Sequence, residues 1–137
     1  MKISPKKLSV GVLASGSGTD LQSIIDASEK HMIDAEVVVV ISDKEAAGAL
    51  VRAKTQGIPG FFVNPKGKDR PGHEHEIDVI LHHHQVELVV GAGYMRLLSP
   101  SFVKKWHEKI INIHPALLPS FKGTNGQRDA LEYGVKI

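Results

Sequence analysis

The sequence predicts one α/β domain over residues 1–137, built on a doubly wound and mainly parallel sheet. Short apolar runs alternate with segments of helical periodicity along the chain, which is the pattern of repeated β–α–β units. One run, residues 37–41, is continuously apolar, as expected for a parallel strand covered by helices on both faces. The chain has 137 residues, of which 42% are hydrophobic and 23% charged, and this composition is typical of a globular domain with a real core.

Each expected element follows from a local pattern of β-branched runs, helical periodicity, or Gly and Pro at the ends. The expected strands are Leu8–Leu13, 37–41, 61–63, 88–90 and Ile110–Ile113. The expected helices are 21–27, 46–56, 73–85, 100–106 with Ser99 as its N-cap, and 127–133. Residues 135–137 begin another strand, so we expect an unfinished sheet and a chain that is the truncated N-terminal domain of a longer protein.

Charge and composition exclude several classes of protein. The net charge of +2 is too small to indicate a nucleic-acid-binding surface, and no apolar run has the length of a membrane span. The chain has no cysteine, which excludes disulfides and thiolate metal ligands and agrees with a reducing compartment. We therefore expect a cytoplasmic protein whose partners are small molecules, with neither nucleic acid nor membrane among them.

A glycine-rich turn follows the first strand and leads into a helix. Its residues are Gly16, Ser17, Gly18, Thr19 and Asp20. A strand–turn–helix unit of this kind aims backbone N–H groups and the positive end of the helix dipole at an anion. A dinucleotide fingerprint needs a third glycine where Leu21 stands, so the turn favours a phosphate monoester. The alternative is a plain turn with Thr19 or Asp20 as N-cap. Asp43 lies at about the sequence distance from the turn where the ribose-binding residue of a dinucleotide fold would sit. A dinucleotide-binding Rossmann module is therefore an alternative.

The loop after residues 88–90 begins with two glycines, which let a ligand approach the backbone closely. It continues with Met95, Arg96, Leu97 and Leu98. Arg96 can pair with a carboxylate or stack on a flat ring between its apolar neighbours. The alternative is an ordinary exposed loop arginine.

Asn112 and His114 lie two residues apart, so on a strand both side chains leave the same face. Pro115 cannot donate to a ladder and ends that strand. An Asn amide and a protonated His are donors for an oxyanion, and His also moves protons near neutral pH, so the pair suits acyl-group transfer. The alternative is that Asn112 caps a turn and His114 is an interior histidine with its hydrogen bonds satisfied.

Five histidines lie in the expected helix 73–85, namely His73, His75, His82, His83 and His84. They form no recognised ligand motif with a carboxylate, so we expect no metal. We expect a solvated helix face instead, shared with Glu74, Glu76 and Asp78. The glycine-rich turn, the loop with Arg96 and the Asn112/His114 pair all follow parallel strands, so they should share one rim of the sheet.

With these motifs in order, the chain resembles the folate-dependent phosphoribosylglycinamide formyltransferases of purine biosynthesis. The resemblance runs through VLASGSGTDLQSIIDA, VISDK, GAGYMRLLSPSFV, INIHPALLPSFKG and ALEYGVKI. It implies a Rossmann-like formyltransferase fold without its C-terminal part. It also implies transfer of a formyl group from 10-formyltetrahydrofolate, the co-substrate, to the amine of glycinamide ribonucleotide.

The resemblance implies a role for each matching residue. The turn from Gly16 to Asp20 would hold the substrate phosphate. Met95, Arg96, Leu97 and Leu98, together with Asn112, would bind the folate. Asn112 and His114 would stabilise the tetrahedral oxyanion, with His114 also positioned as an acid. A homodimer is one assembly open to such an enzyme.

Three departures from the family pattern bear on activity. Asp20 stands where members often carry Asn, and a carboxylate beside a phosphate dianion is unfavourable unless it faces away or caps the helix. Residues 122–127 replace a loop that commonly contains His, so no ligand from that loop transfers. The family's catalytic Asp lies past the strand that begins at Val135, so we expect this chain alone to be inactive or nearly so.

Related activities stay open at this point. Methionyl-tRNA formyltransferase shares an Asn-x-His and a Leu-Leu-Pro, but the phosphate turn and Pro115 argue against it. Formyltetrahydrofolate hydrolase uses water as the acceptor and needs no phosphate cradle. A non-catalytic nucleotide-binding Rossmann module is the alternative from a different class.

Overall fold

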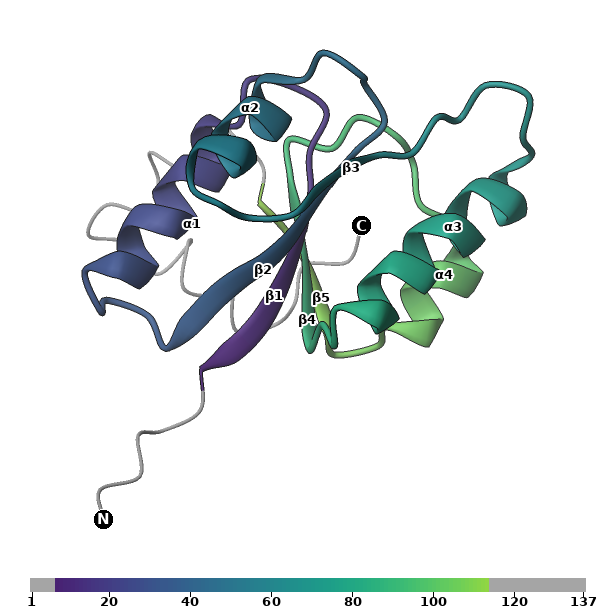
Figure 1. Ribbon diagram of the computed structural model, residues 1–137. Coiled ribbons are helices and arrows are strands. Elements are labelled where there is room, and N and C mark those ends of the chain that lie inside the picture. The colour runs from purple at the N-terminus through teal and green to yellow at the C-terminus, as the bar shows by residue number, and fades with distance from the viewer. Residues whose placement is uncertain (1–6, 114–137) are drawn as a thin grey trace.

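A computed structural model describes residues 7–113, which form a five-stranded sheet between two layers of helices (Figure 1). The strands are β1 (Leu8–Leu13), β2 (Ala35–Ser42), β3 (Gly60–Phe62), β4 (Leu88–Ala92) and β5 (Ile110–Ile113). The helices are α1 (Thr19–Glu29), α2 (Gly48–Thr55), α3 (Arg70–His83) and α4 (Pro100–Lys105). The α/β class expected from the alternating pattern is therefore confirmed.

The strand order is β3–β2–β1–β4–β5, and all neighbouring pairs in the described part of the chain are parallel. The chain moves outward from β1 through β2 and β3, then returns to place β4 and β5 on the other side of β1. This reversal confirms the doubly wound topology. It also sets the loops after β1 and β4 side by side at the carboxyl edge of the sheet, where open α/β sheets bind ligands.

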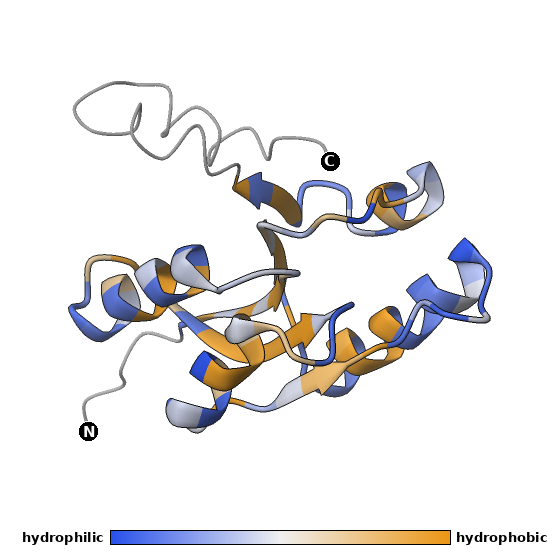
Figure 2. Ribbon diagram, turned by 90° about the horizontal axis from the view of Figure 1, so that it is seen from above, coloured by the Kyte–Doolittle hydropathy of each residue, from blue (hydrophilic) through white to orange (hydrophobic). Residues whose placement is uncertain are grey.

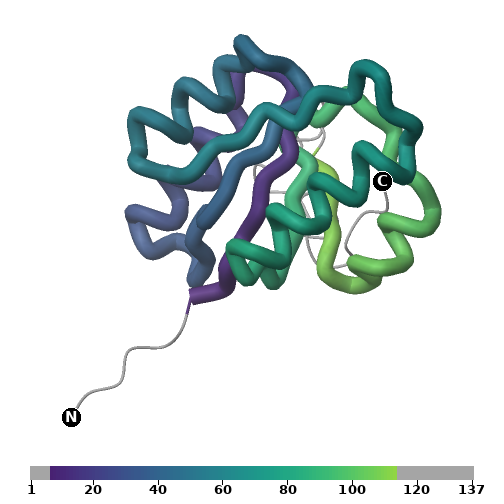
Figure 3. Tube along the Cα trace, turned by 45° about the vertical axis from the view of Figure 1, so that its right-hand side comes forward, coloured from purple at the N-terminus to yellow at the C-terminus, as the bar shows by residue number. Residues whose placement is uncertain are grey.

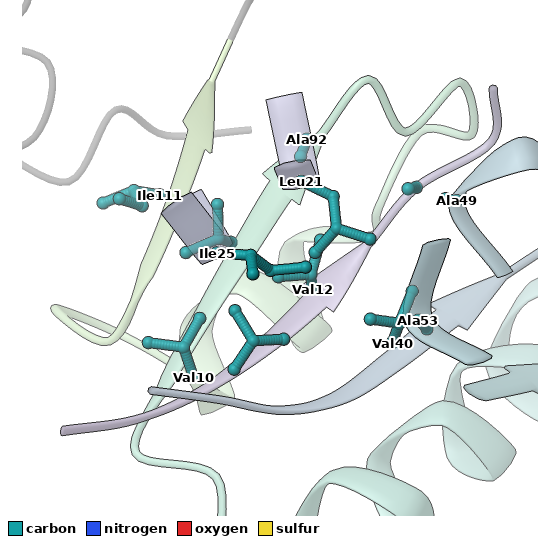
Figure 4. Close-up of a cluster of buried hydrophobic side chains, with 12 residues drawn as sticks. Val10, Val12, Leu21, Ile25, Val40, Ala49, Ala53, Ala92 and Ile111 are labelled. Carbon is teal, nitrogen blue, oxygen red and sulfur yellow. The ribbon is translucent and has the colours of Figure 1, made fainter. Parts of the chain in front are cut away.

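Each face of the sheet has its own core. On one face, Leu21 and Ile25 of α1 and Ala49 and Ala53 of α2 pack against buried valines of the strands (Figure 4). On the other face, Ile77 and Leu81 of α3 and Phe102 of α4 pack with Trp106, and α3 and α4 lie side by side (Figure 3). The strands carry the apolar side chains that both layers bury, and they are largely orange in Figure 2.

Several element ends differ from the sequence expectation. Helix α3 begins three residues early, at Arg70, because the Asp69 carboxylate accepts a hydrogen bond from Gly72 N at 2.8 Å and Pro71 fits the first turn. Helix α2 begins two residues late, at Gly48, and β4 continues to Ala92. Ser99 caps α4 as expected, accepting from Phe102 N at 3.2 Å.

The expectation of a solvated face on α3 is wrong for three of its polar residues. His73, Glu74 and Asp78 are buried. Nε2 of His73 lies 2.9 Å from the carbonyl oxygen of Val63, and Asp78 accepts from Trp106 Nε1 at 3.0 Å. Helix α3 packs on the sheet and beside α4, so these polar groups find partners on other elements that helical periodicity does not reveal.

The turns at the amino edge of the sheet adopt left-handed backbone conformations. His31 (φ 58°), Gln85 (φ 56°) and Glu108 (φ 63°) lie in the turns that lead into β2, β4 and β5. The equivalent turn before β3 uses a glycine, Gly57, with φ 72°. Only glycine adopts this conformation without a steric cost.

Several expectations concern residues outside the described range. They are the roles of His114 and Pro115, the loop 122–127, the helix 127–133 and the strand beginning at Val135. Within residues 7–113, no helix is both long enough and apolar enough to cross a bilayer.

Candidate active site

The carboxyl edge of the sheet brings two of the predicted sites into contact. Ser15, the residue before the glycine-rich turn, donates its N–H to Gly93 O at 3.2 Å, and its Oγ accepts from Met95 N at 2.8 Å. The turn after β1 and the loop after β4 are therefore hydrogen-bonded to each other. Asn112 lies on the next strand, β5. The expectation of a shared rim is confirmed for these described residues.

The glycine-rich turn leaves its backbone open to a ligand. Gly16, Ser17 and Thr19 are exposed, and no side chain in the described part of the chain caps α1. The N-cap is Gly18 in a left-handed conformation (φ 82°), so the alternative in which Thr19 or Asp20 is the N-cap is wrong. An uncapped helix start presents N–H groups and a positive dipole end, which suits a phosphate.

Helix α2 donates hydrogen bonds to the backbone of this turn, a contact that the sequence did not indicate. Ala49 N donates to Gly16 O at 3.0 Å, and Arg52 Nε donates to Ser17 O at 2.8 Å. A Cβ on Gly18 would lie 2.6 Å from the Cα of Ala49, so only glycine allows this close approach. Arg52 brings a guanidinium to the cradle across 35 residues of sequence, and no local motif signals that contact.

Asp20 is buried, whereas Gly16, Ser17 and Thr19 of the same turn are exposed. Its side chain is buried and, with Ser23, lines the polar end of an apolar groove of about 310 Å³ between α1 and strands β1, β4 and β5. Burial raises the pKa of the Asp20 carboxyl above its ordinary value of 3.8. The carboxylate therefore opposes a bound phosphate less than its position in the sequence implied.

The loop after β4 divides into exposed and buried side chains. Met95 and Leu97 are 79% and 69% exposed, and Arg96 is also exposed. Leu98 is 5% exposed and packs in the core with Phe102. Three side chains can therefore meet a flat ring, whereas Leu98 can offer a ligand only its backbone and anchors the loop instead.

Asn112 lies inside β5 and is half-buried, so the alternative in which it caps a turn is wrong. Ile110, two residues earlier, packs in the core under α3 and α4, and the two-residue period of a strand directs Asn112 to that face. Its register partner on β4 is Gly91, which has no side chain. The same face carries Leu98 and Tyr94, so the loop and the Asn112 amide share one side of the sheet.

Asp43 does not behave as the ribose partner of a dinucleotide. It is 4% exposed and accepts a hydrogen bond from Ser15 Oγ at 2.6 Å. Burial of a carboxylate is tolerated because this hydrogen bond compensates part of the lost hydration. The geometry therefore weakens the dinucleotide-binding alternative and assigns Asp43 to the interior of the rim.

No three His, Cys, Asp or Glu side chains gather in a metal-binding arrangement within residues 7–113. The expectation that the protein uses no metal stays a prediction.

The rim thus combines an anion cradle, an exposed apolar loop with an arginine, and an amide, all after parallel strands of one sheet. The sequence pattern of the formyl transferase family matches residues 8–137, and the chain belongs to this family. The human trifunctional purine biosynthetic protein adenosine-3 is 44% identical over 133 residues, which cover 96% of this chain and 13% of that protein.

Two further relatives narrow the comparison. Phosphoribosylglycinamide formyltransferase of Haemophilus influenzae is 42% identical over 126 residues, covering 91% of this chain and 59% of the relative. Glycinamide ribonucleotide transformylase 1 from Geobacillus kaustophilus superimposes with a TM-score of 0.76 at 36% identity, covering 94% of this chain and 69% of that structure. The chain is therefore homologous to phosphoribosylglycinamide formyltransferases and spans only part of each of these three proteins.

Proposed function

We propose that this chain provides the substrate-binding rim of a phosphoribosylglycinamide formyltransferase. The reaction transfers a formyl group from 10-formyltetrahydrofolate to the amine of glycinamide ribonucleotide, in de novo purine biosynthesis. The observation that carries the proposal is the hydrogen-bonded junction between the glycine-rich turn and the loop after β4, beside Asn112. This junction supports one site that takes a phosphate at one end and a flat ring at the other.

The binding roles follow from exposure and charge. The N–H groups of the turn from Gly16 to Asp20 bind the phosphate of the ribonucleotide, with the Arg52 guanidinium nearby. Met95, Arg96 and Leu97 contact the folate, supported by the buried Leu98. The missing side chain at Gly91 leaves room for the formyl group beside Asn112.

The chemistry is an acyl transfer. The amine attacks the formyl carbon, a C–N bond forms and the carbonyl electron pair moves to oxygen. Asn112 donates an amide N–H to this oxyanion, and His114 supplies a charged donor and holds a proton. Collapse breaks the bond to N10 of tetrahydrofolate, which takes up a proton as the new amide loses one. The chain spans 59% of the length of the Haemophilus influenzae relative, so the whole reaction is tested below on a chain of the relative's full length as well.

The wider assignment follows the same line. We infer a cytoplasmic enzyme that acts on small molecules without a metal, does not bind nucleic acid or membranes, and can form a homodimer. Its chain of net charge +2 without cysteines agrees with that setting.

The test is an assay of formyl transfer to glycinamide ribonucleotide by two proteins. One is the 137-residue chain, and the other is a chimera in which the remaining length of the Haemophilus influenzae relative follows Ile137. We expect turnover by the chimera and little by the chain alone. In the chimera, Asn112→Ala should lower kcat by roughly 10²- to 10³-fold, because one oxyanion donor is lost.

Asn64→Ala is the matched control, since Asn64 is exposed and follows β3 at the opposite side of the sheet. It should leave kcat unchanged. Formate release without a formylated product would assign the hydrolase reaction instead. An inactive chimera that binds a reduced nicotinamide dinucleotide would support the Rossmann alternative and refute the proposal.

A further inference from the structure

Two buried carboxylates lie beside the loop after β4, and neither has a role in the proposed chemistry. Asp43 follows β2 and Glu74 lies in α3, and they are 4% and 7% exposed. A carboxylate is costly to bury unless it is hydrogen-bonded, so its partners indicate why it is there.

Asp43 acts on the first end of the loop through Ser15. Asp43 Oδ1 accepts the Ser15 hydroxyl proton at 2.6 Å, and Ser15 Oγ accepts from Met95 N at 2.8 Å. A hydroxyl has one proton to donate, so its donation to Asp43 leaves the lone pairs of Ser15 facing Met95. The carboxylate therefore fixes the hydroxyl in the orientation that holds the loop.

Glu74 acts on the other end of the loop through Ser99. Glu74 Oε2 accepts from Ser99 N at 2.7 Å, and Glu74 Oε1 accepts from Ser99 Oγ at 2.5 Å. Ser99 is also the N-cap of α4 and accepts from Phe102 N. Both oxygens of one carboxylate are thus used on a single residue, which fixes where the loop ends and the helix starts.

Tyr94, within the loop, lies close enough to both carboxylates for their charges to affect its hydroxyl. Burial raises the pKa of its hydroxyl well above the ordinary value of 10, and the negative charges of Asp43 and Glu74 raise it further, against the opposing effect of Arg96. The two carboxylates therefore act on the loop from two different places, the residue after β2 and helix α3, while Met95, Arg96 and Leu97 stay exposed between the anchored ends.

We propose that Asp43, acting through Ser15, and Glu74, acting through Ser99, are positioning residues that preorganise the Met95–Leu98 segment to receive the flat ring of the folate. This inference rests on the proposed function. A segment fixed at both ends before binding loses less conformational entropy when the ligand arrives, which strengthens binding.

The test combines a ligand-free readout with two ligands, using the 137-residue chain. Amide hydrogen exchange at Met95 and Ser99 reports the anchoring directly. Titrations with 5-formyltetrahydrofolate, which does not transfer its formyl group, and with ribose 5-phosphate report the two ends of the rim. In Ser15→Ala we expect Met95 exchange to rise about tenfold and the folate Kd about tenfold, with the ribose 5-phosphate Kd unchanged.

Conservative variants separate positioning from general packing. Asp43→Asn keeps an oxygen that accepts the Ser15 proton, so it should restore most of the folate affinity that Asp43→Ala loses. Glu74→Gln keeps the volume but offers Ser99 one acceptor instead of two, so Ser99 exchange and the folate Kd should rise about threefold. The two ends of the loop are tested by separate variants. If one variant fails to fold, the variant at the other end still tests the proposal. Ser101→Ala, an exposed serine of α4, is the matched control.

The inference is overturned if Ser15→Ala and Glu74→Gln keep wild-type exchange at Met95 and Ser99 and wild-type folate affinity. It is also overturned if folate and ribose 5-phosphate affinities fall equally, because that result indicates loss of the whole rim. Faster Met95 exchange in Ser15→Ala, together with no folate binding by the wild-type chain, would refute the folate role and with it the proposed function.

Discussion

Asp20 combines a favourable position with an unfavourable environment. As the second residue of α1 its negative charge benefits from the helix dipole, yet burial raises its pKa above 3.8. Between pH 3.8 and the raised pKa, the folded chain holds more protons than the unfolded chain. By linkage, stability therefore falls as pH rises through that interval, and the full cost is present at neutral pH.

Asp20→Asn should therefore make the chain more stable at pH 7, with an advantage that vanishes as the pH falls below 3.8. It should also tighten ribose 5-phosphate binding by roughly threefold, because a like charge near the dianion is removed. Urea unfolding across pH and phosphate titration measure the two effects. Asp26→Asn, an exposed carboxylate of the same helix, is the control. An Asp20→Asn advantage that is the same at every pH would contradict the argument.

Single residues also show where sequence reasoning ends. The glycine-rich turn was recognisable because its signal lies in consecutive residues, and its main uncertainty, the N-cap, was a local detail. Ser15 and Asp43 are 28 residues apart, and Ser15 and Met95 are 80 apart. Only the register of β2, β1 and β4 brings these three residues together, and no local motif signals the hydrogen bonds between them.

At the scale of elements, the turn depends on how closely α1 and α2 approach. Gly18→Ala forces a residue with a side chain into φ 82° and sets its Cβ 2.6 Å from the backbone of Ala49. We expect it to lower the free energy of unfolding by about 3 kcal/mol, combining the left-handed conformation with overpacking.

Gly16→Ala is the matched substitution, because its Cβ would meet nothing within 4 Å. It should change stability by less than about 0.5 kcal/mol. Urea denaturation of both variants provides the measurement. Equal destabilisation by the two substitutions would mean that the contact between α2 and the turn does not decide the local conformation.

Helix α3 shows why the burial of polar residues on a helix is hard to predict from this sequence. Its apolar positions Ile77 and Leu81 recur at helical spacing and lie in the core. Its polar residues His73, Glu74 and Asp78 were expected in solvent, since composition gives no sign that Val63, Ser99 and Trp106 supply partners for them. A buried polar residue can be predicted only when its partner is known.

At the scale of the whole molecule, the alternation of strands and helices was sufficient to predict the doubly wound sheet and the shared rim. Chain order and right-handed crossovers leave few topologies for such a pattern. Which loop side chains face a ligand and which face the core was not predictable in the same way. Whether Leu98 faces a ligand or the core depends on how α4 packs, and the structure places it in the core.

The left-handed turns lie at the amino edge of the sheet, far from the proposed binding rim at the carboxyl edge. Stability can therefore be changed there without touching the rim. His31, Gln85 and Glu108 adopt a conformation that suits glycine, at the end of the sheet opposite the rim. Each of His31→Gly, Gln85→Gly and Glu108→Gly should stabilise the chain by roughly 0.5–1 kcal/mol. The three effects should add, because the turns precede three different strands.

Urea denaturation of the triple variant, with ribose 5-phosphate titration beside it, checks both parts of this expectation. Higher stability with unchanged affinity is the expected result, and lower affinity would show that the two edges are coupled. These three turns are therefore positions where protein engineering can increase stability. Thermal stability can be raised at one end of the sheet, while the residues proposed to bind substrate evolve independently at the other.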